Sequence, residues 1–194
     1  MRLLERDDSL LVVIDAQRSF ADRVNGAGVA ASTVIERIAW LTGVAGALGV
    51  PVVMTEEDPD RNGATDSRIL DAAAAGTPTP FGKPVFGLAA EDEIVQAVGH
   101  TGRRTAVLTG FETDVCVAQS ALGLLDLGYR VAVVVDATGS PGEMHEHGLR
   151  RMRDAGAIAV HAKGVYYEWI RSLEAALAFE RAHPELADPP GFSL

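Results

Sequence analysis

The sequence predicts an α/β fold built around a mostly parallel sheet. Two observations support this prediction. Short, almost uncharged apolar runs recur along the chain, as expected for strands that are buried on both faces of such a sheet. Helix-compatible stretches separate successive runs, and this alternation is typical of right-handed β-α-β units.

The apolar runs predict the strands and the edge of the sheet at which a site would form. Strands are expected at Leu10–Ile14, Val50–Met54, Thr105–Leu108, Arg130–Val135 and Ala157–Val160. Asp15 directly follows the first run, and the acidic cluster Glu56–Asp58 follows the second. In open parallel sheets, functional groups gather at the carboxyl ends of the strands. These acidic residues are therefore candidates for a functional site.

The first long helix is predicted between the first two strands. Apolar residues recur in steps of four and three from Val34 to Leu48, which places them on one helix face. Thr33 and Glu36 have the spacing of a capping box and are expected to cap this helix.

Three more helices are expected in the second half of the chain, at Cys116–Leu127, about 140–155 and about Glu168–His183. Gly128 suits the end of the first of them. Ser140 as N-cap, with Pro141 in the first helical position, predicts the start of the second.

Two segments are expected to have little regular structure. Pro59–Pro84 is rich in turn formers and reads as a long loop with a short helix, and long ordered loops often serve function. Asp188–Gly191 reads as a loose end.

The bulk composition predicts one globular domain over residues 1–194. The chain has 47% hydrophobic and 23% charged residues, a normal globular mixture. Its formal net charge of −10 disfavours nucleic acid and anionic membranes as partners, because both need a basic face.

The cysteine content and the N-terminus bear on location. Cys116 is the single cysteine, so no internal disulfide can form, which fits a reducing compartment. Met1–Ser9 lacks the apolar core of a signal peptide, and no apolar run approaches the roughly 20 residues that span a bilayer. The sequence therefore predicts a cytoplasmic protein.

Cys116 lies where a thiol could be activated. It follows the third strand by a short loop and opens a helix, where free backbone N–H groups and the helix dipole lower a thiol pKa. The same N–H groups could hold an oxyanion. Asp15 is the carboxylate expected to act as base. A lone cysteine is, however, more often a small buried hydrophobic residue.

Three segments resemble the isochorismatase-like cysteine hydrolases, relatives of nicotinamidase and N-carbamoylsarcosine amidase. Asp15–Phe20 resembles the family's Asp-x-Gln-x-x-Phe segment, and Gly110–Val117 resembles its nucleophile loop, Gly-x-x-Thr-Asp-x-Cys-Val. Between them, Phe81–Phe86 resembles the segment that carries the family's lysine. The resemblance covers about residues 8–175 and implies a three-layer, Rossmann-like sandwich with a sheet of roughly six strands.

The resemblance implies a catalytic triad of Asp15, Lys83 and Cys116. Asp15 would take the thiol proton as Cys116 attacks a carbonyl carbon, and would later activate the water that hydrolyses the thioester. Lys83 would orient Asp15. A cis peptide is expected between Phe111 and Glu112, with the N–H groups of Glu112 and Cys116 as the oxyanion hole. Without the other two residues, Lys83 would be interpreted as a solvated surface lysine and Asp15 as a helix cap.

The cysteine favours hydrolysis of a C–N bond in a small amide, carbamoyl or ureido compound. The residues expected to contact this small-molecule substrate are Gln17, Phe20, Glu57, Phe86 and Phe111. Glu112 stands where relatives commonly have a small apolar residue, so its side chain either points away or narrows the substrate range. An isochorismatase-type ether hydrolase is one alternative, and a non-catalytic ligand-binding or thiol-sensing protein on the same fold is another.

The metal site of family nicotinamidases is expected to be absent. By position, Glu57 and Pro59 replace its Asp and His, and the first histidine of the chain is His100. No metal or cofactor is therefore predicted. The acidic cluster Glu56–Asp58 either meets a cationic part of the substrate or faces solvent.

Two further expectations concern surfaces. His145 and His147 are two residues apart, which on a helix points them in different directions, so they read as a solvated face. Oligomers are common in the family, and a homodimer or homotetramer is expected. Val165–Phe179 could supply the interface or could cover the sheet.

Overall fold

The computed structural model describes residues 3–24 and 30–194 and contains a parallel sheet with the order β3-β2-β1-β4-β5-β6. The strands are β1 Ser9–Ile14, β2 Val52–Glu57, β3 Phe81–Lys83, β4 Thr105–Phe111, β5 Arg130–Gly139 and β6 Ile158–Val160. Every neighbouring pair of strands in this sheet is parallel. The predicted α/β fold, with a mostly parallel sheet of roughly six strands, is confirmed.

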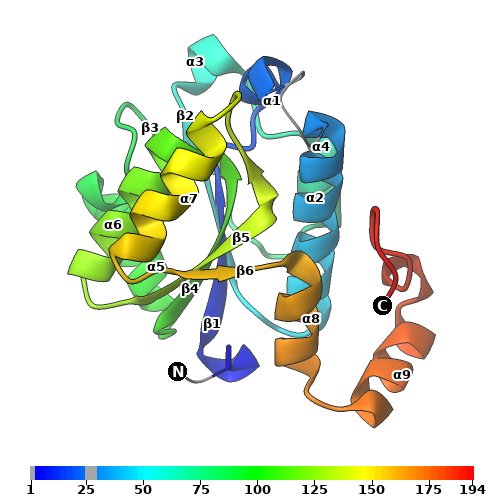
Figure 1. Cartoon of the computed structure of the whole chain (residues 1–194). Coiled ribbons are helices and arrows are strands. Elements are labelled where there is room, and N and C mark those ends of the chain that lie inside the picture. Colours follow the sequence, from blue (N-terminus) through cyan, green and yellow to red (C-terminus); the bar gives the residue numbers. More distant parts are fainter. Residues whose placement is uncertain (1–2, 25–29) are drawn as a thin grey trace.

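Helices cover both faces of the sheet, as Figure 1 shows. They are α1 Arg18–Val24, α2 Ala31–Ala47, α3 Pro59–Asn62, α4 Ser67–Ala72, α5 Asp92–His100, α6 Ala118–Asp126, α7 Met144–Asp154, α8 Ala162–Ile170 and α9 Leu173–Ala182. Helices α2 and α8 lie on one face, and α5, α6 and α7 lie on the other. Helices α1 and α3 lie over the edge at which the strands end.

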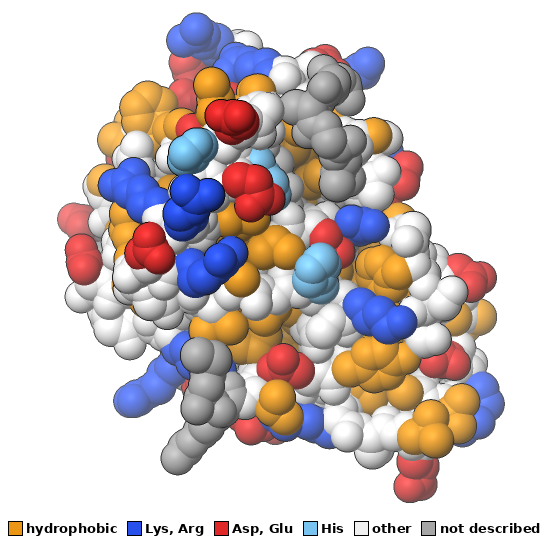
Figure 2. Space-filling view, in the orientation of Figure 1, with side chains coloured by type: hydrophobic (Ala, Val, Ile, Leu, Met, Phe, Trp, Pro, Cys, Tyr) orange, Lys and Arg blue, Asp and Glu red, His pale blue; other side chains and the backbone are white. Residues whose placement is uncertain are grey.

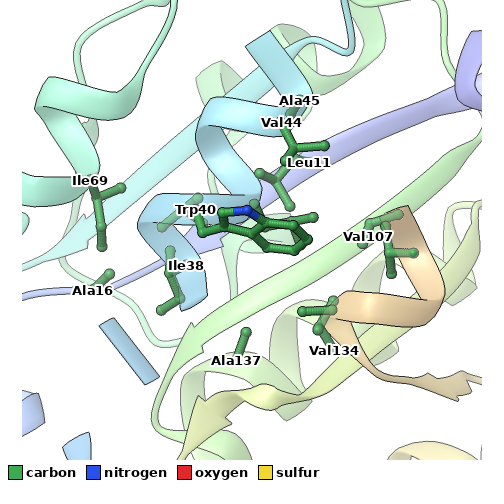
Figure 3. Close-up of a cluster of buried hydrophobic side chains, with 14 of the residues drawn as sticks. Leu11, Ala16, Ile38, Trp40, Val44, Ala45, Ile69, Val107, Val134 and Ala137 are labelled. Carbon is green, nitrogen blue, oxygen red and sulfur yellow. The ribbon is translucent and has the colours of Figure 1, made fainter. Parts of the chain in front are cut away.

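The residues of β1 alternate between the two layers of the core. Leu11 and Val13 belong to the cluster under α2 and α8, whereas Leu10, Val12 and Ile14 belong to the cluster under α5, α6 and α7. Because neither face of this strand meets solvent, its residues from Leu10 to Ile14 are all apolar. Figure 3 shows part of the first cluster, in which Trp40 and Val44 of α2 lie over the strands.

Helix α7 shows how a polar sequence still packs on the sheet. Its inner side buries Gly148, Leu149 and Met152. Basic side chains gather over its outer side in the space-filling view (Figure 2), where the last turn carries Arg151 and Arg153. Positive charge at this end of a helix complements the helix dipole.

The segment predicted as a long loop with a short helix contains β3, a strand that was not predicted. Residues 59–84 contain α3, α4 and β3, and β3 pairs with the end of β2 in the register Thr55↔Phe81 to Glu57↔Lys83. Three residues are too few for a periodic signal, and Gly82 in the middle weakens the strand pattern further. The strand exists because β2 continues into Glu57 and offers a partner.

Both predicted helix caps are wrong. Helix α2 begins at Ala31, and the N–H of Thr33 already bonds the carbonyl of Ala30, so Thr33 lies inside the first turn. Helix α7 begins at Met144 rather than after Ser140, because the Ser140 hydroxyl instead donates to Asp114 Oδ1 at 2.6 Å. Gly128, at φ 85°, follows the end of α6, as predicted, and Gly156, at φ 105°, follows the end of α7.

The helix predicted over 168–183 is two helices. Arg171, at φ 75°, ends α8, and the Ser172 side chain accepts a hydrogen bond from the N–H of Ala175 to cap α9. Helix α8 buries Val165, Tyr166 and Trp169, so this part of the segment covers the sheet. No helix in the described ranges is both long and apolar enough to cross a bilayer.

The C-terminal tail is packed rather than loose. Phe192 makes an edge-to-face contact with Trp40, with ring centroids 5.4 Å apart. Arg37 Nε donates to the carbonyl of Pro190 at 3.1 Å. The tail, drawn in red in Figure 1, therefore contributes to the core over α2.

Candidate active site

Four neighbouring strands bring one polar group each to the same edge of the sheet. Asp15 follows β1, Thr55 lies in β2, Lys83 ends β3, and Cys116 lies in a π-helical turn, Thr113–Val117, after β4. The strand order β3-β2-β1-β4 makes these strands consecutive neighbours. The structure thus collects the three residues predicted to form a triad.

Lys83 is a buried lysine whose three ammonium protons all have acceptors. Its Nζ lies 2.7 Å from Asp15 Oδ2, 2.9 Å from the carbonyl of Val85 and 2.8 Å from that of Phe86. The residue is 1% exposed, so it is not a surface lysine. This arrangement pins one positive charge beside Asp15.

Asp15 is held between these partners and the thiol. Its Oδ1 accepts a hydrogen bond from the Thr55 hydroxyl at 2.8 Å, and its backbone, at φ 48°, donates from N–H to the carbonyl of Thr55 at 3.0 Å. The carboxyl also interacts with the Cys116 thiol, and each group shifts the pKa of the other. Burial raises the pKa of Asp15, against the opposing charge of Lys83. The group is therefore suited to both accepting and returning a proton.

The Cys116 thiol is protonated at rest. It is 2% exposed, and burial together with the charge of Asp15 raises its pKa far above the usual thiol range. Lys83 and a hydrogen bond from the backbone of Glu112 act in the opposite direction but do not outweigh burial. The expectation of a lowered thiol pKa at a helix N-terminus is therefore wrong, and deprotonation has to accompany attack.

The backbone before Cys116 brings a donor to the sulfur. The peptide bond between Phe111 and Glu112 is cis, and the backbone of Glu112 hydrogen-bonds the Cys116 thiol. The carbonyl of Glu112 accepts the N–H groups of Val115 and Val117 at 3.2 and 3.0 Å, which closes the π-helical turn. The turn thus holds the thiol next to a backbone N–H group.

Gly110 lets β4 approach β1 just before this turn. It has φ 126°, and a Cβ there would lie 1.8 Å from the carbonyl oxygen of Ile14. Gly110→Ala is expected to lower the free energy of unfolding by about 3 kcal/mol or more, because strain and overlap add. Urea unfolding would measure this loss.

Gly102→Ala is the matched control for that variant. Gly102 has φ 68°, but a Cβ there would meet nothing within 4 Å, so only the backbone strain of about 1–2 kcal/mol is expected. If both variants lose the same free energy of unfolding, the close approach of residue 110 to the carbonyl of Ile14 adds no cost of its own.

A cavity of about 160 Å³ opens beside Cys116. It is lined by Phe20, Arg23, Glu57, Arg61, Asn62, Phe86, Glu112, Val115 and Cys116. An apolar cavity of similar size holds a benzene molecule, so a substrate with a small acyl group fits the space. Of the residues predicted to contact substrate, Phe20, Glu57 and Phe86 lie on this wall.

Gln17 and Phe111 do not line the cavity. The Gln17 amide is buried and bonds main-chain groups: its Nε2 donates to the carbonyls of Glu57 and Gly63, and its Oε1 accepts from the N–H of Glu57 at 2.8 Å. Phe111 is fully buried, and its ring lies against Gly139. Gln17 therefore holds the end of β2 in place, and Phe111 belongs to the core.

Sequence reasoning missed Arg23, Arg61, Asn62 and Val115. Arg23 lies one helical turn after Phe20, a spacing that could have placed both on one face of α1. Arg61 and Asn62 belong to α3, inside the segment predicted as a loop. Their position directly after the acidic end of β2 is the signal that could have found them.

Charges of both signs line the cavity. The Glu112 side chain lies on its wall, with Oε1 3.8 Å from Arg23 Nη1, and burial raises the pKa of this carboxyl. Glu57 Oε2 accepts a hydrogen bond from Asn62 Nδ2 at 3.0 Å. The lining is therefore mixed and polar around the nucleophile. The Glu112 side chain therefore does not point away from the cavity, which was one of the two alternatives.

Glu56 of the acidic cluster and His145 have structural contacts. Glu56 Oε1 accepts from the N–H of Thr65 at 2.7 Å. His145, predicted to be solvated, is half-buried, with Nδ1 2.9 Å from Thr113 Oγ1, whereas His147 is exposed. Within residues 3–24 and 30–194, no group of three or more His, Cys, Asp or Glu side chains is arranged to hold a metal ion.

Comparisons with known proteins identify the family of this chain. Residues 9–163 match the family model of the isochorismatase domain. A secreted isochorismatase effector of Phytophthora sojae is 34% identical over 163 residues, which cover 82% of this chain and 76% of the relative.

Solved structures show the same fold. A MAR1 ribonuclease of Caenorhabditis elegans aligns with a TM-score of 0.84 at 24% identity, covering 100% of this chain and 98% of that one. An octameric hydrolase of unknown specificity from Escherichia coli aligns with a TM-score of 0.82 at 23% identity, covering 96% of this chain and 93% of that one. The chain belongs to the isochorismatase family of hydrolases.

Proposed function

We propose that this chain is a cysteine hydrolase that cleaves the C–N bond of a small amide, carbamoyl or ureido substrate through a thioester on Cys116. The observation that carries the proposal is the buried Asp15 carboxyl, which contacts both Lys83 and the Cys116 thiol. A nucleophile, a base within hydrogen-bond reach and a group that orients the base together make up the arrangement of covalent catalysis.

In the acylation step, the Cys116 sulfur attacks the substrate carbonyl carbon while the thiol proton passes to Asp15. The carbonyl oxygen becomes an oxyanion, for which the N–H groups of Glu112 and Cys116 are the proposed donors. As the C–N bond breaks, Asp15 gives the proton to the leaving nitrogen. Ammonia or an amine departs, and the acyl group stays on Cys116 as a thioester.

In the deacylation step, Asp15 takes a proton from a water molecule that attacks the thioester carbon. The C–S bond then breaks, and Asp15 returns the proton to the sulfur. The acid product leaves and the thiol is restored. Lys83 keeps its contact with Asp15 throughout and balances the negative charge that passes between Asp15 and Cys116.

The raised pKa of the thiol argues against the thiol-sensing alternative. A redox sensor needs an accessible thiolate, and Cys116 is buried and protonated. The ether-hydrolase alternative needs no nucleophilic cysteine, and it remains the second candidate because relatives of this chain are described as isochorismatases.

Release of ammonia from a panel of small amides, carbamoyl compounds and ureides tests the proposal. The acyl groups are chosen up to about the size of benzene, to suit the cavity, and an isochorismate-type vinyl ether is assayed beside them. Ammonia release supports C–N hydrolysis and names the substrate class. Turnover of the vinyl ether alone would support the ether-hydrolase alternative instead.

The pH dependence of kcat/KM is a second expected result. Asp15 must be ionised to accept the thiol proton, and its pKa is raised, so activity should rise with pH through an apparent pKa above the usual aspartate value of about 3.9. The apparent pKa of this rise belongs to Asp15, Lys83 and Cys116 together, because the three groups interact. An acid limb at or below about 3.9 would contradict the role given to Asp15.

Assembly, location and domain organisation stay predictions. The octameric state of the Escherichia coli hydrolase supports a homo-oligomer for this chain, with a dimer or tetramer as the expected state. The cytoplasmic location and the single-domain organisation are also proposed, and the secreted relative from Phytophthora sojae makes the location worth measuring.

A further inference from the structure

Helix α7 packs directly on the turn that carries Cys116. A Cβ on Gly148 would lie 2.7 Å from the Cα of Asp114 and 2.8 Å from the carbonyl oxygen of Thr113. Backbone therefore meets backbone at this point. A side chain larger than glycine at residue 148 would overlap the turn Thr113–Val117.

Two side chains tie the same turn to α7 and its preceding loop. Ser140 Oγ donates to Asp114 Oδ1 at 2.6 Å, and His145 Nδ1 lies 2.9 Å from Thr113 Oγ1. Thr113 is fully buried, and His145 is half-buried. The mechanism proposed above uses neither Thr113 nor His145, so the contact between them has no assigned role.

The imidazole of His145 can accept a hydrogen bond from Thr113 in its neutral form. A neutral ring has one N–H and one lone pair, so the Thr113 hydroxyl can donate to Nδ1 when the proton is on the other nitrogen. The contact thereby links α7 to the nucleophile turn.

The neutral form is favoured at this position. Burial lowers the pKa of His145, although the charges of Glu146 on α7 and Asp114 on the turn act in the opposite direction. Asp136 of β5 lines the same small cavity as His145 and is already paired with Arg37 at 3.5 Å. The hydrogen bond between Thr113 and His145 is therefore expected to persist at neutral pH.

Thr113 lies in the chain between a proposed oxyanion donor and the nucleophile. It directly follows Glu112, a proposed oxyanion donor, and precedes Cys116 within one turn. We infer that His145 is a positioning residue, which holds the segment Glu112–Cys116 through the Thr113 hydroxyl so that its donors and its thiol face the substrate. This inference rests on the proposed hydrolase function and gives His145 no contact with the reacting atoms.

The experiment compares His145→Ala with His147→Ala, an exposed histidine on the same helix. Displacing catalytic groups by about 1 Å costs on the order of a hundredfold in rate, so His145→Ala should lower kcat by about 10- to 100-fold. KM should change by less than about threefold, because the lost alignment acts on the transition state. His147→Ala should keep both constants.

Further variants separate positioning from general loss of structure. Thr113→Val removes the hydroxyl alone and should lower kcat by a similar factor, and the double variant should be no worse than either single one. His145→Asn, whose side-chain amide can reach the same hydroxyl, should restore part of kcat. A kcat for His145→Ala within twofold of the wild type, or additive losses in the double variant, would overturn the inference.

A readout that needs no turnover distinguishes failure of this inference from failure of the proposed function. Cys116 is the single cysteine, so alkylation by iodoacetamide reports on this residue alone. In folded protein, His145→Ala and Thr113→Val should change the alkylation rate by the same factor, and His147→Ala should not change it. Equal rates for all variants would overturn the inference even if no panel substrate is hydrolysed.

Discussion

Cys116→Ala is expected to reduce turnover of an amide substrate by on the order of 10⁴-fold or more, because no other group can form the thioester. The cavity wall keeps its other residues, so substrate should still bind to the variant. Ammonia release measures the first effect, and calorimetric titration with a substrate of the wild type measures the second.

Direct detection of the thioester strengthens the test. Intact mass spectrometry of wild-type protein quenched in acid during turnover should show the added acyl group, and Cys116→Ala should show none. Cys116→Ser keeps a proton for Asp15 to accept and separates the loss of a nucleophile from the loss of sulfur. Turnover that survives in Cys116→Ala would remove the thioester and favour the ether-hydrolase mechanism.

Lys83→Met is expected to cost both stability and activity. Removing one partner of a buried ion pair typically costs roughly 3–5 kcal/mol, because the other charge is left buried and unpaired. Asp15 can escape part of this cost by taking up a proton, and then it no longer accepts one from Cys116. Loss of the base at neutral pH should lower kcat/KM by about 10²- to 10⁴-fold.

The pH dependence of this stability loss identifies its cause. Lys83 opposes the raised pKa of Asp15, so its removal raises that pKa further. A carboxyl whose folded pKa exceeds its unfolded value of about 3.9 stabilises the fold when protonated, and this stabilisation is lost as pH rises through the folded pKa. The deficit of Lys83→Met relative to the wild type should therefore be smallest in acid and grow toward neutral pH.

Urea unfolding of both proteins between pH 4 and pH 8 measures this deficit. Lys163→Met is the matched control, because Lys163 is exposed and its Nζ contacts only a backbone carbonyl, that of Ser193. A deficit that stays constant with pH would contradict the coupling between Lys83 and Asp15.

Much of the fold was predictable because a strand buried on both faces has apolar residues at successive positions. The run from Leu10 to Ile14 is apolar at every position since both of its faces are covered, and the apolar runs inside β2, β4 and β5 are buried in the same way. The strand Phe81–Lys83 has no such run, because its three residues are a strand only through pairing with β2. The break at Arg171 was missed for a similar reason, since nothing in its residue type ends a helix.

Local capping motifs failed where tertiary contacts competed for the same group. Ser140 has the residue type and the following proline of an N-cap, but its hydroxyl bonds Asp114 across the nucleophile turn. Such competition cannot be read from a window of neighbouring residues. The same limit explains Gln17, whose amide is consumed by the backbone of Glu57 and Gly63.

The sequence by itself determined the five apolar strands and the motifs that carry Asp15, Lys83 and Cys116, because hydrophobic pattern and residue identity are local properties. Only the tertiary structure decided the burial of Lys83, the protonated state of Cys116 and the membership of Arg23 and Arg61 in the cavity wall. Each of these depends on which atoms surround a side chain. Charge state and exposure follow from that environment, which forms when segments far apart in the sequence meet.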